Sequence, residues 1–371
     1  MRASVRPIKL MMTADAVGGV FTYALDLAAG LAPHGIETTL VVLGPAMNAA
    51  QRAAASSVPG LAVIQSGLPL DWLAADEAGL TAAAAAVAAI AARAEADLVH
   101  LNTPALAVAS YAVPVVAAAH SCVASWWAAV RGGELPDDFV WRTRAMARGL
   151  GAADAVVCPS RTYAETLSAT YAVAATAVHN GRAGPPAVGA DAPLAQAFTA
   201  GRLWDEGKNI GVLDAAAALT GVRIAAAGPL DGPDGTHTGL LNVHRMGVLS
   251  DPQIRGYLAA KPIFVSTARY EPFGLAVLEA AQAGCPLVLS DIPTFRELWS
   301  GAALFTPVDD PAAVAAALDA LAADRGKRVR MGEAARARAG RYSVEAMAAG
   351  LVEIYRRVHP NLALDIRETA A

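Results

Sequence analysis

Short runs of apolar residues alternate with longer amphipathic stretches along nearly the whole chain. Most of the runs are apolar at successive positions, which is typical of strands in a parallel sheet covered by helices on both faces. In the first half they lie at 8–13, 37–43, 61–64, 97–101, 114–119, 155–158 and 175–179. In the second half they lie at 195–200, 222–227, 242–246, 262–267, 286–290 and 302–306. Residues 310–357 are predicted to be helical throughout, so the pattern indicates an α/β protein.

The chain is too long for one ordinary hydrophobic core, because it has 371 residues. The segment RAGPPAVGADAP at 182–193 is rich in proline, glycine and alanine and is the best candidate for a linker. We therefore predict an N-terminal domain over 1–181, a linker or hinge over 182–193 and a C-terminal domain over 194–342. Both would be Rossmann-like, doubly wound parallel-sheet domains that face each other across a cleft. Ligands of such sheets bind beyond the carboxyl ends of the strands.

Composition and charge narrow the class of protein. Hydrophobic residues make up 55% of the chain, but the longest apolar run, at 80–92, is shorter than the roughly 17–25 residues that span a bilayer. The formal net charge is −4 with no basic block, so nothing favours a nucleic acid partner. Cys122, Cys158 and Cys285 are far apart and odd in number, which indicates reduced thiols. We expect a cytoplasmic protein without a transmembrane segment; a peripheral membrane contact stays open.

The segment RYEPFGLAVLEA at 269–280 places Glu271 and Glu279 on either side of a Pro-Phe-Gly turn. The turn follows an apolar run and is predicted to open a helix. On a continuous helix, eight residues would separate the two carboxylates by roughly 12 Å along the axis. The free N–H groups of the first turn could bind an anion between them. The alternative is a helix with an exposed acid near each end.

The segment GRLWDEGKN at 201–209 also follows a predicted strand. It contains Arg202 and Lys208, with glycines that let the backbone bend. Two cations at the end of a strand suit a diphosphate, because arginine donates as a fork and lysine acts as a mobile point charge. They would stabilise the charge that develops on a departing nucleoside diphosphate. The alternative is a solvated loop.

Two glycine-rich loops and one histidine also follow predicted strands. Gly18 and Gly19 precede an amphipathic stretch, and Gly228 lies in a second loop, but neither loop has the G-x-G-x-x-G spacing of a dinucleotide site. A tight strand-to-helix turn explains the first loop equally well. His120 directly follows the run at 114–119, where an acceptor would enter, although a lone histidine is more often structural.

Together these residues resemble the retaining nucleotide-sugar glycosyltransferases of family four, which have the GT-B fold. The resemblance covers essentially the whole chain. Its most specific element is Glu271 and Glu279 separated by PFGLAVL. The other matching elements, in chain order, are Gly18 and Gly19, His120, Arg202 and Lys208, Gly228, and the segment with Val248 and Leu249.

The resemblance implies a role for each of these residues. Arg202 and Lys208 would hold the donor diphosphate, and Glu279 would bind the ribose. Glu271 and the backbone of Phe273, Gly274 and Leu275 would hold the transferred sugar and the phosphates. Gly18 and Gly19 would approach the diphosphate, His120 would contact the sugar, Gly228 would belong to the donor site, and the backbone near Val248 and Leu249 would receive the base. The last helix, near 343–358, would cross back to the N-terminal domain.

The implied reaction is metal-independent and needs no cofactor. A sugar would pass with retention from a nucleotide-diphosphate sugar, with UDP-glucose favoured and GDP-mannose second, to an unidentified hydroxyl acceptor, a soluble one being favoured. A non-catalytic nucleotide-sugar-binding protein and a GT-B sugar-nucleotide epimerase are the alternatives. One departure from the family pattern is Arg182, which follows Asn180 and Gly181 where an apolar residue is usual.

Overall fold

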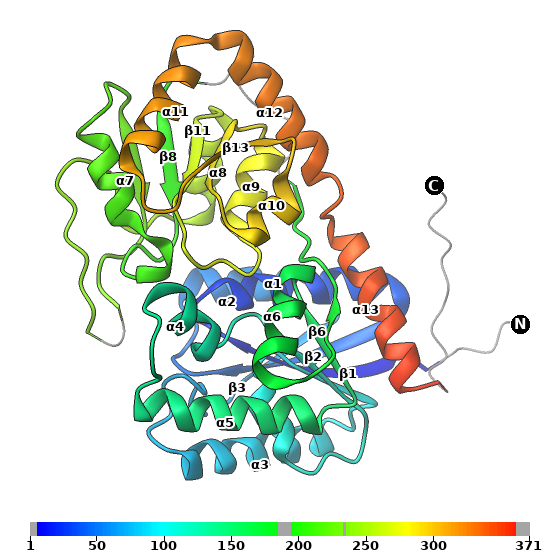
Figure 1. Cartoon of the computed structure of the whole chain (residues 1–371). Coiled ribbons are helices and arrows are strands. Elements are labelled where there is room, and N and C mark those ends of the chain that lie inside the picture. Colours follow the sequence, from blue (N-terminus) through cyan, green and yellow to red (C-terminus); the bar gives the residue numbers. More distant parts are fainter. Residues whose placement is uncertain (1–5, 185–193, 233–234, 361–371) are drawn as a thin grey trace, which may run out of the picture. The chain divides into compact units, whose positions relative to one another are not determined.

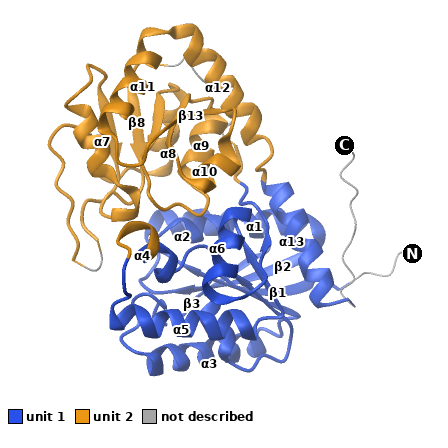
Figure 2. Ribbon diagram, in the orientation of Figure 1, with its two compact units in different colours: residues 1–127, 133–181, 344–371 blue, residues 128–132, 182–343 orange. Residues whose placement is uncertain are grey.

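The structure is a computed structural model and describes residues 6–184, 194–232 and 235–360 (Figure 1). Within these residues the chain divides into two compact units (Figure 2). Unit 1 draws on the ranges 1–127, 133–181 and 344–371, and unit 2 on 128–132 and 182–343. Most of the predicted linker, from residue 185 to 193, lies outside the described residues.

Unit 1 is built on a seven-stranded parallel sheet with the order β3-β2-β1-β4-β5-β6-β7. Its strands are β1 (Ile8–Asp15), β2 (Ile36–Leu43), β3 (Leu61–Gln65), β4 (Leu98–Leu101), β5 (Val115–Ala118), β6 (Ala155–Cys158) and β7 (Thr176–Ala177). The helices that begin in unit 1 are α1 (Gly19–Leu31), α2 (Ala49–Ser56), α3 (Glu77–Arg93), α4 (Val123–Val130, whose last three residues are assigned to unit 2), α5 (Asp137–Ala152), α6 (Arg161–Tyr171) and α13 (Val344–Val358). The 3-10 turns are η1 (Ala32–His34) and η2 (Pro104–Val108).

Unit 2 contains a six-stranded parallel sheet with the order β10-β9-β8-β11-β12-β13. Its strands are β8 (Ala197–Ala200), β9 (Ile224–Ala227), β10 (His244–Arg245), β11 (Ile263–Ser266), β12 (Leu287–Ser290) and β13 (Ala303–Thr306). Its helical elements are η3 (Glu206–Lys208), α7 (Ile210–Ala217), α8 (Asp251–Ala259), α9 (Leu275–Ala283), α10 (Pro293–Trp299), α11 (Pro311–Ala323) and α12 (Arg325–Ala339). Every apolar run predicted as a strand overlaps one, which confirms the α/β fold.

Each sheet is buried on both faces, as the apolar runs predict. In unit 1, α1 and α13 cover one face, and α3, η2 and α5 cover the other. In unit 2, one face packs against α8, α9, α10 and α12, and the other against α7 and α11. The alanine-rich run at 80–92 is part of α3, whose buried side chains face the sheet. No helix in the described part of the chain is long and apolar enough to cross a bilayer.

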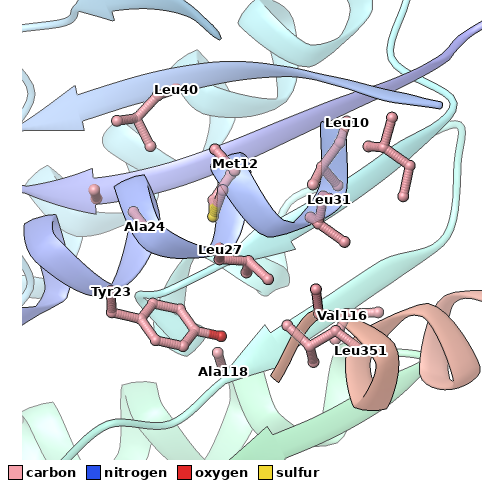
Figure 3. Close-up of a cluster of buried hydrophobic side chains, with 14 of the residues drawn as sticks. Leu10, Met12, Tyr23, Ala24, Leu27, Leu31, Leu40, Val116, Ala118 and Leu351 are labelled. Atoms are coloured by element: carbon pink, nitrogen blue, oxygen red, sulfur yellow. The ribbon is translucent and has the colours of Figure 1, made fainter. Parts of the chain in front are cut away.

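The last described helix, α13, belongs to unit 1 although it follows unit 2 in the chain, which confirms the predicted crossing. Leu351 packs into the same core as Leu27 and Leu31 of α1 (Figure 3). The hydroxyl of Tyr355 lies 2.9 Å from Nδ1 of His100 on β4, and both side chains are buried. Packing and a buried polar contact thus both hold α13 to unit 1.

Candidate functional site

The strand orders place the candidate residues of unit 2 at a topological switch point. In this sheet β8 lies between β9 and β11, so the chain turns in opposite directions on either side of it. The loop after β8 contains Arg202 and Lys208, and the loop after β11 contains Glu271. Since all strands are parallel, both loops leave the same edge of the sheet, where ligands of doubly wound sheets bind.

Hydrogen bonds join these two loops directly. The carbonyl oxygen of Gly207 accepts from the backbone N–H groups of Arg269 and Tyr270, at 2.9 and 3.2 Å. The hydroxyl of Thr267 donates to the carbonyl of Asn209 at 3.0 Å. These bonds fix the position of the loop after β8 relative to the loop after β11, so side chains from both loops can meet.

The side chains that meet are Lys208 and Glu271, which form an ion pair between Nζ and Oε2. The pair is largely enclosed, because the side chains are 26% and 16% exposed. On the same loop, Arg202 donates to Oδ2 of Asp205 at 2.8 Å, and Oδ1 of Asp205 accepts from the N–H of Gly207 at 2.9 Å. Asp205 therefore orients both the arginine and the turn that leads to the lysine, a role that the sequence analysis missed.

The predicted helix after the Pro-Phe-Gly turn is confirmed, but its position corrects one expectation. It begins at Leu275, with Gly274 as N-cap at φ 92°, a left-handed conformation that favours glycine. Glu271 thus lies in the loop before the helix, and the axial separation expected for two glutamates on one helix does not apply. Phe273 is buried against Tyr342, with ring centroids 5.7 Å apart, and this packing anchors the turn.

Glu279 lies on α9 and pairs with Arg182, the residue at which the sequence departs from the family pattern. Oε1 of Glu279 and Nη2 of Arg182 are 2.7 Å apart. The side chains of these residues are 27% and 17% exposed, so this pair is also largely enclosed. The two acids of the motif therefore each have a basic partner, one from the loop after β8 and one from the start of unit 2.

The loops after β9 and β10 follow the same edge. Gly228 lies so close to Gly201 that an added Cβ would be 1.8 Å from the Gly201 carbonyl oxygen. Its N–H donates to the carbonyl of Gly247 at 2.8 Å, which links it to the next loop. Beyond that link Val248 is 75% exposed, whereas Leu249 packs against the core. An exposed apolar residue beside Gly247 is compatible with the predicted base site.

In unit 1, Gly18 and Gly19 follow β1 and begin α1, as predicted. The N–H groups of Val17 and Gly18 donate to Oδ1 of Asp15, at 2.8 and 3.0 Å. A carboxylate of the chain itself thus occupies these two donors, and an anion at Gly18 would have to replace it.

His120 follows β5 and is held by Asn102, which follows β4. The Asn102 amide donates through Nδ2 to the Thr13 carbonyl at 2.6 Å, so its Oδ1 accepts from Nε2 of His120 at 2.7 Å. This network assigns the Nε2–H tautomer and leaves Nδ1 as the acceptor. Burial lowers the pKa of His120 to about 4, so the ring is neutral at pH 7. The sequence analysis missed Asn102, although its place at a strand end was a usable signal.

The site residues thus form three groups within the described chain. Arg202, Lys208 and Glu271 meet at the switch point of unit 2, with Gly228 beside them; Glu279 pairs with Arg182; and His120 lies in unit 1. The ligand roles of all these residues stay predictions.

Comparisons with known proteins agree with this architecture. The profile of Glycosyltransferase Family 4 matches residues 17–182, and that of Glycosyl transferases group 1 matches residues 237–338. The chain is similar to the D-inositol 3-phosphate glycosyltransferase of Xylanimonas cellulosilytica, with 28% identity over 94% of both chains. A stretch of 104 residues, 27% of this chain and 24% of the other, is 40% identical to the enzyme of the same name from Corynebacterium urealyticum.

Solved structures share the fold. Sucrose-phosphate synthase from Thermosynechococcus elongatus superposes with a TM-score of 0.76 at 19% identity, covering 96% of this chain and all of the other. The Anabaena protein HepE in complex with UDP-glucose gives a TM-score of 0.74 at 18% identity, covering 94% of this chain and all of HepE. The fold and the matched profiles thus define a glycosyltransferase with the GT-B fold. The chain belongs to glycosyltransferase family four.

Proposed function

We propose that this glycosyltransferase moves a sugar, with retention of anomeric configuration, from a nucleotide-diphosphate sugar to a hydroxyl acceptor. The observation that carries the proposal is the ion pair of Lys208 and Glu271 at the switch point of unit 2, with Arg202 on the same loop. One cation can serve the leaving diphosphate while the neighbouring carboxylate accepts hydrogen bonds from sugar hydroxyls. A UDP-sugar such as UDP-glucose is the favoured donor, supported by the UDP-glucose complex of HepE, and GDP-mannose is the second donor to test.

In the proposed reaction, the bond between the anomeric carbon and the β-phosphate oxygen breaks, and the acceptor oxygen bonds to that carbon on the same face. The acceptor proton passes to the departing phosphate, so the diphosphate leaves with the proton and the sugar keeps its configuration. Lys208 and Arg202 stabilise the charge that develops on the diphosphate. The N–H groups at the start of α9 support the same charge. These groups take the place of a metal ion in the proposal.

The acceptor is a hydroxyl compound of undefined class. The name of the Xylanimonas relative makes D-inositol 3-phosphate the first acceptor to test. We also propose that the protein works in the cytoplasm, which is supported by its three cysteines forming no disulfide in the structure, because thiols persist in a reducing compartment.

Calorimetric titration with UDP, GDP, ADP and NAD, in buffer with a chelator, tests the donor class and the metal independence together. We expect one nucleoside diphosphate to bind, and binding to fall in a double variant Lys208→Ala/Glu279→Ala. Transfer from the matching sugar nucleotide, followed by NMR of the product, then reports the anomeric configuration. Binding of NAD alone, a strict need for added metal or an inverted product would each contradict the corresponding part of the proposal.

A further inference from the structure

Arg182 is held at three points, all within unit 2. Its N–H donates to the carbonyl of Tyr342 at 3.2 Å, and its own carbonyl accepts from Nε2 of Gln282 at 2.9 Å. Its guanidinium pairs with Glu279 at 2.7 Å. Glu279 and Gln282 are three residues apart on α9, so they project from the same face of the helix. One face of α9 therefore binds both the backbone and the side chain of Arg182.

The pair of Arg182 and Glu279 differs from an ordinary surface ion pair. Exposed pairs such as Arg356 and Glu353, at the same distance of 2.7 Å but 32% and 66% exposed, change little when removed. With Arg182 and Glu279 only 17% and 27% exposed, loss of the arginine would remove a positive charge from beside a partly enclosed carboxylate. The planar guanidinium also restricts the direction of the carboxylate to which it donates.

We propose that Arg182 is a positioning residue that orients the Glu279 carboxylate for the ribose of the donor, and thereby sets the preference for ribose over 2′-deoxyribose. This inference rests on the proposed function, in which Glu279 binds the ribose hydroxyls. An apolar residue at position 182 could neither orient nor neutralise the carboxylate. Hydrogen bonds to Tyr342 and Gln282 fix the backbone of Arg182, so its guanidinium stays beside Glu279. In the proposal the arginine therefore acts on the ligand through Glu279.

The test is calorimetric titration of UDP and GDP, each beside its 2′-deoxy form, into the wild type, Arg182→Leu, Arg182→Lys and Glu279→Gln. We expect the wild type to bind the ribose form about tenfold more tightly, as one hydrogen bond to a charged group allows. Arg182→Leu should lose most of this ratio while affinity for the 2′-deoxy form changes little. Arg182→Lys should keep part of it, since lysine retains the charge but not the fork. Arg182→Leu should add nothing in the Glu279→Gln background.

Arg356→Leu is the matched control, because it removes an exposed arginine from a pair of equal length and should leave the ratio unchanged. Thermal melting shows whether each variant folds. If Arg182→Leu does not fold, the ratio measured for Arg182→Lys tests the inference. A wild-type ratio in the Arg182 variants would overturn this inference but not the donor proposal. Tighter UDP binding in Arg182→Leu would do the same, because it would show that the arginine competes with the ribose for Glu279. A wild type that binds neither nucleotide, or an unchanged ratio in Glu279→Gln, would instead refute the donor proposal on which it rests.

Discussion

The two units hold the candidate residues at their sheet edges by different interactions: unit 2 uses ion pairs, and unit 1 uses a hydrogen bond to an uncharged ring. In unit 2 the candidate residues are charged and paired, as Lys208 with Glu271 and Arg182 with Glu279. In unit 1 the candidate histidine is neutral and is held by the amide of Asn102. Charged pairs suit a site where the charge of a diphosphate must be balanced, whereas a neutral hydrogen-bonded ring suits contact with uncharged hydroxyls. The same type of sheet edge can therefore serve two kinds of chemistry, depending on the side chains that follow its strands.

The largest effect should come from removing Lys208, a cation at the sheet edge of unit 2, which we call the charged edge. Lys208→Ala should lower kcat by about 10² to 10³, because it removes the group that we propose to stabilise the developing charge and leaves Glu271 without its partner. Rapid-quench measurement of the chemical step would give this value. Glu271→Gln in the Lys208→Ala background separates the two causes: partial recovery would assign part of the loss to the uncompensated carboxylate, and a near-normal single variant would remove the lysine from the mechanism.

The second effect tests the backbone of the same edge. Gly228 has φ 144°, and a Cβ there would clash with the carbonyl oxygen of Gly201. Gly228→Ala should therefore lower the free energy of unfolding by about 2 kcal/mol or more and weaken nucleotide binding. Denaturant melts and titration with UDP would measure both effects. Gly221→Ala is the control, since an added Cβ at Gly221 meets nothing within 4 Å; equal losses in the two variants would show that close approach at Gly228 is unimportant.

The third effect concerns the sheet edge of unit 1 with His120, which we call the neutral edge. The family resemblance implies that His120 contacts the transferred sugar, and Asn102 fixes its tautomer. Asn102→Leu should thus lower kcat about tenfold and shift the ¹⁵N resonances of the His120 ring toward a mixture of tautomers. Asn102→Asp keeps an acceptor for Nε2–H and should retain the Nε2–H tautomer. Unchanged ring resonances in Asn102→Leu would show that another contact orients the ring.

The sequence predicts the fold better than it predicts the contacts of the site. Burial on both faces makes a parallel strand apolar at successive positions, so β8 and β11 are visible in the sequence without any long-range information. The pairing of Arg182 with Glu279 joins residues 97 positions apart, and no local pattern encodes such a contact. The sequence marks Arg182 only as a departure from the family pattern, and it marks Asn102 only by its place directly after a predicted strand. The sequence predicts helix starts only approximately. The Pro-Phe-Gly turn predicts that α9 begins near it, but not that Glu271 lies outside the helix.

The smallest effect is on the pH dependence of stability, and it tests whether His120 at the neutral edge is uncharged in the native chain. Burial lowers the pKa of His120 to about 4, and burial together with His120 lowers that of His100 to about 3. Between about pH 6.5 and these values the unfolded chain binds two protons that the native chain does not, so these groups make stability fall as pH falls. Burial raises the pKa of Asp71 to about 6. Below about pH 6 the native chain therefore holds a proton on Asp71 that the unfolded chain lacks, which offsets one histidine.

These three groups together contribute a loss of about 1.4 kcal/mol per pH unit as pH falls between about 6 and 4.5. Burial and Arg356 lower the pKa of His34 as well, which adds to this loss. His120→Asn should remove one of these histidines, so its stability should fall less steeply than that of the wild type in this window, by about 1.4 kcal/mol per pH unit. Urea melts of both proteins at half-unit steps of pH would show the difference in slope. Parallel profiles would mean that His120 titrates in the native chain as it does in the unfolded one. The contrast with the charged edge of unit 2 would then fail, because both edges would carry charge at mildly acidic pH.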